Sequence, residues 1–349
     1  MINISKIAFG FLILFLFACD KDQPDFPIPD VNHIDIPSFS WQRFDQDVMA
    51  MDAENIIKSY KELSIKYPSL TDLYFKRLLS ISQKDSPSFY NNVAAFIKAE
   101  PIQKIQDTIE HVFKNTDNIE SEIKKACQYL KYYFPNTGIP NFYTMQTEFG
   151  YQQIIFPDGD QDGICIGLDL FLGEDFDYKL VDPTNTSFSN YLTRTFNKDH
   201  IAKKVIELKV LDLIGDPPGK RFIDQIIHSG KKLFILERLL PMTHDSVILE
   251  YSKEQVEWIY ENEREIWSFF LDKNLIYETN HLLINKYISP RADSPGMPEI
   301  APGRTGNFIG LQIVKAYVRR YPETTLTELI DMFDAQKLME LSKYKPKRR

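Results

Sequence analysis

Residues 221–241 read RFIDQIIHSGKKLFILERLLP, an apolar-rich stretch with a single histidine, His228, near its middle. The apolar residues recur at spacings of three and four, which predicts an amphipathic α-helix. On that helix Asp224, His228 and Lys232 follow one another at four-residue intervals and share one face. Ion pairing along such a row stabilises a helix. We therefore expect one face of the helix to pack and the stripe of Asp224, His228 and Lys232 to be presented at the surface.

The histidine raises the question of a zinc peptidase helix. Such a helix places His at positions i and i+4 around one metal, with Glu at i+1 as the general base. Here position i+1 is Ser229 and position i+4 is Lys232, so the second ligand and the base are both missing. The motif predicts that the protein is not an enzyme. A zinc site assembled only by the fold, in a metal-dependent hydrolase, is the alternative.

The chain opens with the features of a secretory signal. Lys6 precedes an apolar run at residues 7–18, and that run is shorter than the ~20 residues of a membrane-spanning helix. The following Cys19 completes LFAC, which resembles a bacterial lipobox. We expect residues 1–18 to be removed and Cys19 to be acylated, for example with palmitate. This predicts a lipid anchor in the cell envelope, on the periplasmic or outer surface of a membrane.

A tether is expected to follow the anchor. Residues 19–40 begin CDKDQPDFPIPD, in which closely spaced prolines replace any apolar periodicity, so this segment is extended and does not pack. No second linker is evident beyond it. We therefore expect residues 41–349 to form a single domain.

Composition supports a folded domain and argues against nucleic acid as a partner. Hydrophobic residues make up 43% of the 349 residues, which is enough for a sizeable core. The 41 basic and 49 acidic residues give a net charge of -8, which does not suit a polyanion. Besides Cys19, the sequence has Cys127 and Cys165, which form either one disulfide or two buried thiols.

The order of elements predicts an α+β fold that is mainly α. Residues 53–134 have helical periodicity interrupted by prolines, and helices return after Asp199. Between them, residues 141–170 contain strand-like runs, which predict a small antiparallel sheet between two helical parts. Near the C-terminus, Thr325 and Glu328 have the spacing of a capping box that opens a helix.

An acidic, glycine-containing segment is the clearest candidate for a metal site. In DGDQDGICIGLD, residues 158–169, Asp158, Asp160, Asp162 and Asp169 match positions one, three, five and twelve of a calcium loop. The flanking residues read as strands, however, and Asp and Gly also suit a polar hairpin turn. The segment therefore fits either a calcium site or a plain hairpin, and calcium is the one cofactor that the sequence suggests.

A glycine-rich segment before a late helix offers a second candidate. In APGRTGNFIG, Arg304 and neighbouring backbone amides have the arrangement of an anion site at a helix start. Close helix packing at Gly306 and Gly310 explains the glycines without a ligand, and we favour packing.

Several segments together resemble the gliding-motility lipoprotein GldB family of Bacteroidetes. Besides the lipobox ending in Cys19, the likeness is carried by YQQIIFP, IGLDLFLG, IIHSGKKLFILERLLP, YSKEQVEWIYENEREIWSFFLDKNLIYETN and PGRTGNFIGLQIVKAYVRRYP, in that order along the chain. The helix around His228 also looks like that of a distant, degenerate relative of zincin-type peptidases, so the resemblance implies a zincin-like arrangement in part of the fold.

The family resemblance implies a function that the residues alone do not. It implies a lipoprotein required for gliding motility and type IX protein secretion, acting as a non-enzymatic structural component of the envelope machinery. Its expected partners are other gliding and secretion proteins of the envelope, and the membrane through the lipid anchor. A metal-dependent hydrolase and a calcium-stabilised binding module are the alternatives.

Overall fold

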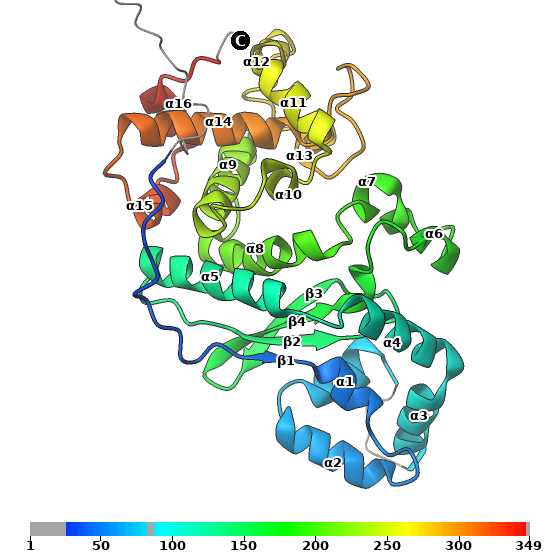
Figure 1. Cartoon of the computed structure of the whole chain (residues 1–349). Helices are drawn as coiled ribbons and strands as arrows, with labels where there is room; N and C mark the ends of the chain where they lie inside the picture. Colours follow the sequence, from blue (N-terminus) through cyan, green and yellow to red (C-terminus); the bar gives the residue numbers. More distant parts are fainter. Residues whose placement is uncertain (1–25, 82–86, 347–349) are drawn as a thin grey trace, which may run out of the picture. The chain divides into compact units, whose positions relative to one another are not determined.

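The computed structural model describes residues 26–81 and 87–346 (Figure 1). The chain divides into two units, Met1–Asp30 and Val31–Arg349, and the second is compact. Val31 and Ile36 are buried. Part of the segment that the sequence assigns to the tether therefore belongs to the compact unit. The predicted signal peptide and Cys19 lie outside the described residues.

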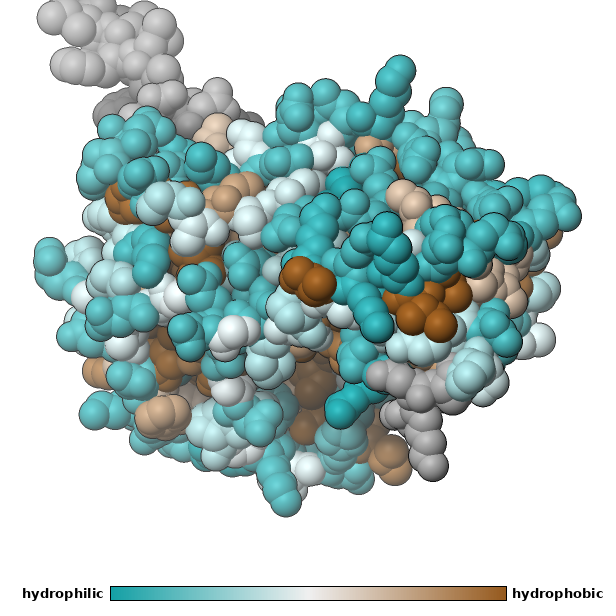
Figure 2. All heavy atoms as spheres, turned by 90° about the horizontal axis from the view of Figure 1, so that it is seen from below, coloured by the Kyte–Doolittle hydropathy of each residue, from teal (hydrophilic) through white to brown (hydrophobic). Residues whose placement is uncertain are grey.

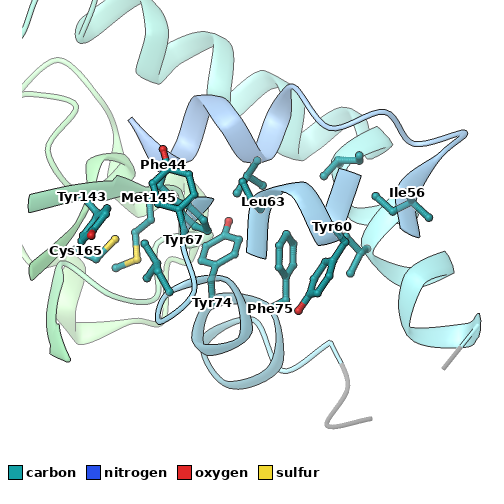
Figure 3. Close-up of a cluster of buried hydrophobic side chains, with 14 of the residues drawn as sticks. Phe44, Ile56, Tyr60, Leu63, Tyr67, Tyr74, Phe75, Tyr143, Met145 and Cys165 are labelled. Atoms are coloured by element: carbon teal, nitrogen blue, oxygen red, sulfur yellow. The ribbon is translucent and has the colours of Figure 1, made fainter. Parts of the chain in front are cut away.

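The N-terminal part of the compact unit is helical, as predicted. Its elements are α1 (Phe44–Met49), α2 (Ile56–Lys66), the π-helix η1 (Leu73–Leu78), α3 (Pro87–Lys98), α4 (Glu100–Val112) and α5 (Asp117–Tyr133). Aromatic side chains join the first of these helices to the sheet (Figure 3): Phe44, Tyr67 and Tyr74 pack with Tyr143 and Met145 in one buried cluster. Aromatic pairs of this kind bury large areas and prefer edge-to-face geometry, which the rings of Phe44 and Tyr74 adopt at 86°.

The central sheet is mixed, so the prediction of an antiparallel sheet is wrong in part. Its strands are β1 (Trp41–Gln42), β2 (Asn141–Met145), β3 (Gln153–Asp158) and β4 (Gln161–Gly167), in the order β1-β2-β4-β3. Only β3 and β4 are antiparallel, as a hairpin. Within this hairpin β4 is the strand that pairs with β2, and the two run parallel. Strand β1 pairs with the other edge of β2, also in parallel.

The C-terminal part is also helical. After the 3₁₀ turn η2 (Leu168–Leu170), its elements are α6 (Tyr178–Val181), η3 (Thr186–Phe188), α7 (Asn190–Thr193), η4 (Lys198–His200), α8 (Ile201–Ile214), α9 (Phe222–Leu239), α10 (Asp245–Leu249), α11 (Lys253–Glu261), α12 (Glu263–Asp272), α13 (His281–Ile288), α14 (Thr305–Arg320), α15 (Leu326–Asp331) and α16 (Ala335–Ser342). The predicted capping box of Thr325 and Glu328 opens α15. The fold is therefore α+β and mainly α, as expected.

Helix α9, which carries His228, lies at the centre of the C-terminal helices. It packs against α14 most extensively and also against α8, α16 and α5 (Figure 1). Its apolar side chains are buried on more than one side, including Ile223, Ile226 and Ile235. The surface seen from below in Figure 2 is mainly hydrophilic, with small separate hydrophobic patches. Burial of α9 is thus a main source of the hydrophobic stabilisation of this part.

The contact between α9 and α14 is a backbone contact, and glycine makes it possible. A Cβ placed on Gly310 would lie 1.7 Å from the carbonyl oxygen of Ile226, and one on Gly230 would lie 2.2 Å from the carbonyl carbon of Gly310. Gly306 is similarly close to its surroundings, since a Cβ there would lie 2.9 Å from the ring of Phe222. The expectation that Gly306 and Gly310 serve close packing is confirmed.

We predict that Gly310→Ala destabilises the protein strongly. The added methyl group forces α9 and α14 apart, and overpacking of a buried contact costs about 1–3 kcal/mol or more. Thermal unfolding followed by circular dichroism measures the effect. Gly138→Ala is the matched control, because a Cβ there meets nothing within 4 Å. Equal melting temperatures for the two variants would contradict the prediction.

Candidate functional site: a buried ion network on α9

Asp224, the first residue of the predicted surface stripe, is buried. Its side chain accepts hydrogen bonds from the backbone N–H of Arg221 at 3.0 Å and from Nη2 of the same residue at 2.7 Å. This is a capping box at the start of α9. The first turn of a helix has N–H groups without partners inside the helix, and a carboxylate at the third position satisfies one of them. The prediction of an exposed stripe is therefore wrong for Asp224, which pairs backwards with Arg221 instead of forwards with His228.

His228 is half-buried in the second turn of α9. Burial lowers the pKa of its imidazole to about 4, and the neighbouring Lys231 and Lys232 act in the same direction. The imidazole is therefore neutral near pH 7. Lys231 is itself a structural group, because its ammonium donates to the carbonyl oxygen of Met332 at 2.6 Å just beyond the end of α15. His228 thus lies beside cations whose positive charges disfavour a bound proton or divalent metal.

Lys232 occupies the position where a zinc helix has its second histidine. Its ammonium forms an ion pair with the Glu207 carboxylate on α8 at 2.7 Å. The side chain is only 23% exposed. The third member of the predicted stripe is therefore a cross-link between α8 and α9, and it pairs with a different residue from Asp224.

The Lys232–Glu207 pair is one end of a buried network of alternating charges. Lys203, whose side chain is 2% exposed, bridges Glu207 at 2.6 Å and Glu250 at 2.7 Å. Glu250 also accepts from Lys204 at 2.7 Å and from Nη1 of Arg304 at 2.9 Å. The network joins α8, α9, the end of α10 and the start of α14.

Each member of the network stabilises the charged form of its neighbours. Burial opposes the charge on Lys203, but Glu207 and Glu250 outweigh it and raise the pKa of the ammonium. Burial likewise opposes the Glu207 carboxylate, yet Lys203 and Lys232 lower its pKa to about 2. The pKa of Glu250 lies well below its usual value for the same reason, with Lys203 and Arg304 as the main partners. Lys203, Glu207 and Glu250 are thus held in their charged forms, and removal of Glu250 leaves Lys204 and Arg304 without their carboxylate partner.

The backbone is strained at two members of the network. Glu250 and Arg304 both adopt left-handed conformations, with φ of 57° and 59°. Such conformations cost non-glycine residues of the order of 1 kcal/mol. Side-chain contacts hold them in place: Arg304 donates to the carbonyl oxygen of Leu249 at 3.0 Å, and Tyr251 donates to the carbonyl oxygen of Gly303 at 2.9 Å. The guanidinium of Arg304 is thus engaged within the protein, which supports the packing interpretation of this segment over an anion site.

The predicted calcium segment forms the β3–β4 hairpin. Asp158 ends β3, and Asp160 lies exposed in the turn after Gly159, whose φ of 65° is left-handed. Asp162 lies on β4, where its carboxylate accepts a hydrogen bond from the Lys209 ammonium at 2.7 Å. The polar hairpin, which was the alternative, therefore describes this segment.

Asp169, the expected twelfth ligand, lies apart from the hairpin turn. Its fully buried carboxylate accepts from the backbone N–H groups of Thr147 at 2.9 Å and Phe149 at 2.6 Å. Burial outweighs these hydrogen bonds and raises its pKa to about 6. Among the residues described, no group of three or more His, Cys, Asp or Glu is placed to hold a metal ion. The structure thus does not bring the four predicted ligands together.

The two remaining cysteines are free thiols. Cys127 on α5 and Cys165 on β4 are both buried and do not form a disulfide. Of the two interpretations that the sequence leaves open, the buried free thiols are confirmed.

Sequence reasoning missed most of the ion network. Lys203 and Glu207 stand four residues apart in HIAKKVIELK, a spacing that predicts an ion pair on one helix. No local signal connects them with Glu250 or Arg304, because those partners meet only through the packing of α8, α9 and α14. The unusual feature that the sequence does show is the concentration of charge within a strongly apolar helix.

Fold and site together define a mainly helical α+β protein whose most prominent polar feature is a structural ion network. The family model of the gliding motility protein GldB matches residues 26–346. The chain therefore belongs to the GldB family, and it is a gliding-motility-related, membrane-anchored lipoprotein. No curated protein and no solved structure matches the chain. In the ranges 26–81 and 87–346, no helix is both long and apolar enough to cross a bilayer.

We predict that Glu250→Gln costs about 3–5 kcal/mol of stability. The variant keeps the shape of the side chain but removes the charge that balances Lys203, Lys204 and Arg304, and breaking a buried ion pair has a cost of this size. Urea unfolding measures it. Glu100→Gln is the control, since its pair with Lys104 is exposed and such pairs contribute about 0–1 kcal/mol. A loss below about 1 kcal/mol at Glu250 would contradict the prediction.

We also predict that stability falls as the pH drops from about 6.5 towards 4. Burial lowers the pKa of His200 and of His228 to about 4, so the unfolded chain takes up protons in this window that the folded chain does not. The contribution is complete above about pH 6.5, the ordinary pKa of histidine, and decreases as the pH falls. The raised pKa of Asp169 acts in the opposite sense, since its contribution is complete at low pH and is lost as the pH rises through about 6.

Comparison of variants isolates the histidines. His200→Gln should flatten the pH dependence of the free energy of unfolding between about pH 4 and 6.5, by at most about 3 kcal/mol. Exposed His111→Gln is the matched control. The same slope in both variants would show that His200 does not titrate as proposed.

Proposed function

We propose that this lipoprotein acts in gliding motility and type IX protein secretion as a non-enzymatic structural component of the envelope machinery. Membership of the GldB family supports the connection with gliding. The observation that carries the non-enzymatic part is the Lys232–Glu207 ion pair of 2.7 Å at the fourth position after His228. An ammonium held in an ion pair neither binds a metal nor activates water, so this helix face is suited to cross-linking helices.

The electrostatics around His228 support the same proposal. A general base is most effective when its pKa lies near the working pH, whereas the pKa of His228 is lowered to about 4. Ser229 follows it where a zinc peptidase has its catalytic Glu. The network instead fixes the relative positions of four helices, which suits a protein that works through its surface.

The proposed place of action follows from the lipid anchor. Acylation at Cys19 attaches the compact unit to a membrane of the envelope, where its surface meets other gliding and secretion proteins. Partner recognition is then a property of the exposed faces of the helices, and the network beneath them keeps those faces in a fixed arrangement.

Complementation of a deletion strain tests this function. The wild-type gene should restore both spreading on surfaces and secretion, and His228→Gln should restore both equally well, because the imidazole has no chemical role. Cys19→Ser, which removes the acylation site, should fail to restore either one. Immunoblots control for the abundance of each variant. Loss of function in His228→Gln at normal abundance would overturn the non-enzymatic proposal, and normal spreading and secretion in the deletion strain would overturn the function as a whole.

A further inference from the structure

The exposed face of α5 has an unusual charge pattern. Residues on one side of a helix recur at three- and four-residue spacing, and on the outward side of the second half of α5 these are Lys124, Lys125, Gln128, Lys131 and Tyr132. The opposite side holds buried apolar residues such as Ile123, Cys127 and Leu130. This half of the outward face thus contains three lysines and no carboxylate, on a chain whose net charge is -8, whereas Asp117 and Glu120 continue the same face in the first half of the helix.

The lysine stripe lies where the chain enters the compact unit. Lys125 donates to the side-chain oxygen of Asn32 at 2.6 Å, and Gln128 donates to the carbonyl oxygen of Ile34 at 2.8 Å. Figure 1 shows this dark blue segment passing α5 on its way to β1. The same segment also carries exposed carboxylates, at Asp30 and Asp35. The start of the compact unit, at Val31, is therefore adjacent to the stripe.

The length of the anchor restricts what this face can meet. Residues 19–30 span at most about 40 Å even when fully extended. With Cys19 acylated, Val31 stays within that distance of the bilayer, and the stripe beside Val31 stays close to the membrane as well. Lysines near an anionic membrane surface are attracted to lipid headgroups, and tyrosine is enriched at membrane interfaces. Tyr132, at 46% exposure, completes the stripe.

We propose that the outward face of α5 docks on anionic phospholipid headgroups and so orients the anchored domain on its membrane. The inference rests on the anchor at Cys19 proposed above. Lysines supply the attraction, Tyr132 inserts at the level of the headgroups, and the opposite side of the domain is left available to proteins. Docking of this kind adds a second, reversible contact to a lipid anchor, and stable attachment generally uses two such signals.

Vesicle binding tests the inference without acylation. The mature chain from residue 19 with Cys19→Ser is mixed with vesicles of neutral phosphatidylcholine, or of phosphatidylcholine containing phosphatidylglycerol, and sedimented. We expect binding to the anionic vesicles only, and we expect it to weaken as salt is raised. Each lysine at such a surface strengthens binding about fivefold. The double variant Lys124→Gln, Lys131→Gln should therefore bind about thirtyfold more weakly.

The control pair distinguishes this face from charge in general. Lys58 and Lys61 are exposed on α2, whose outer side also carries exposed Ile57 and Ile65. Lys58→Gln with Lys61→Gln removes the same charge, and we expect it to bind like the parent chain, with equal melting temperatures for all variants. Equal weakening in both pairs, weakening only in the α2 pair, or no preference for anionic vesicles would each overturn the inference. None of these results bears on the proposed acylation of Cys19, because the assay uses the Cys19→Ser chain. Fractionation of the acylated protein tests the anchor separately.

Discussion

The arrangement of the C-terminal helices depends on two buried carboxylates, those of Glu207 and Glu250. Buried ammonium and guanidinium groups are tolerated only when opposite charges meet them, and these two side chains meet Lys203, Lys204, Lys232 and Arg304. Because the cations come from α8, α9 and the start of α14, the network only forms when these helices are in place. It therefore specifies one arrangement of helices as well as contributing to their stability.

The close contact of α9 with α14 imposes a second constraint on the same helices. Gly310 lets the backbone of α14 approach the carbonyl oxygen of Ile226, and this contact fixes the distance between the two axes. The network then acts at the start of α14, where Arg304 reaches Glu250. Close packing sets how near the helices approach, and charge pairing restricts how they slide and rotate. Side-chain hydrogen bonds, from Arg304 to the carbonyl oxygen of Leu249 and from Tyr251 to that of Gly303, maintain the left-handed backbone at Glu250 and Arg304.

Local sequence signals predicted what local interactions determine. The helix at 222–239, the capping box at Thr325 and the packing role of Gly310 all follow from spacing or from the geometry of glycine, and the structure bears them out. Signals failed where the partner is distant in the chain. Strand β1 pairs in parallel with β2, which lies far along the chain, and β4 lies between β2 and β3, so that the neighbour of β2 is not the next strand in sequence. Local patterns do not predict either parallel pairing. Asp224 has the spacing of an exposed stripe, but its carboxylate is needed by the first turn of its own helix.

The charges on α9 differ from those of a zinc peptidase helix. In a zinc peptidase, a divalent cation supplies positive charge on this face and two neutral imidazoles hold it. Here the positive charge is on a side chain of the protein, Lys232, and the Glu207 carboxylate on α8 balances it. A fixed ammonium stabilises the charge of its carboxylate partner, but it offers no coordination position for water. Its effect is to hold the two helices rigidly together. The low pKa of His228 has burial as its main cause, and Lys231 and Lys232 add to it by repelling the proton that a catalytic imidazole has to carry. The Lys232–Glu207 pair thus holds α9 against α8.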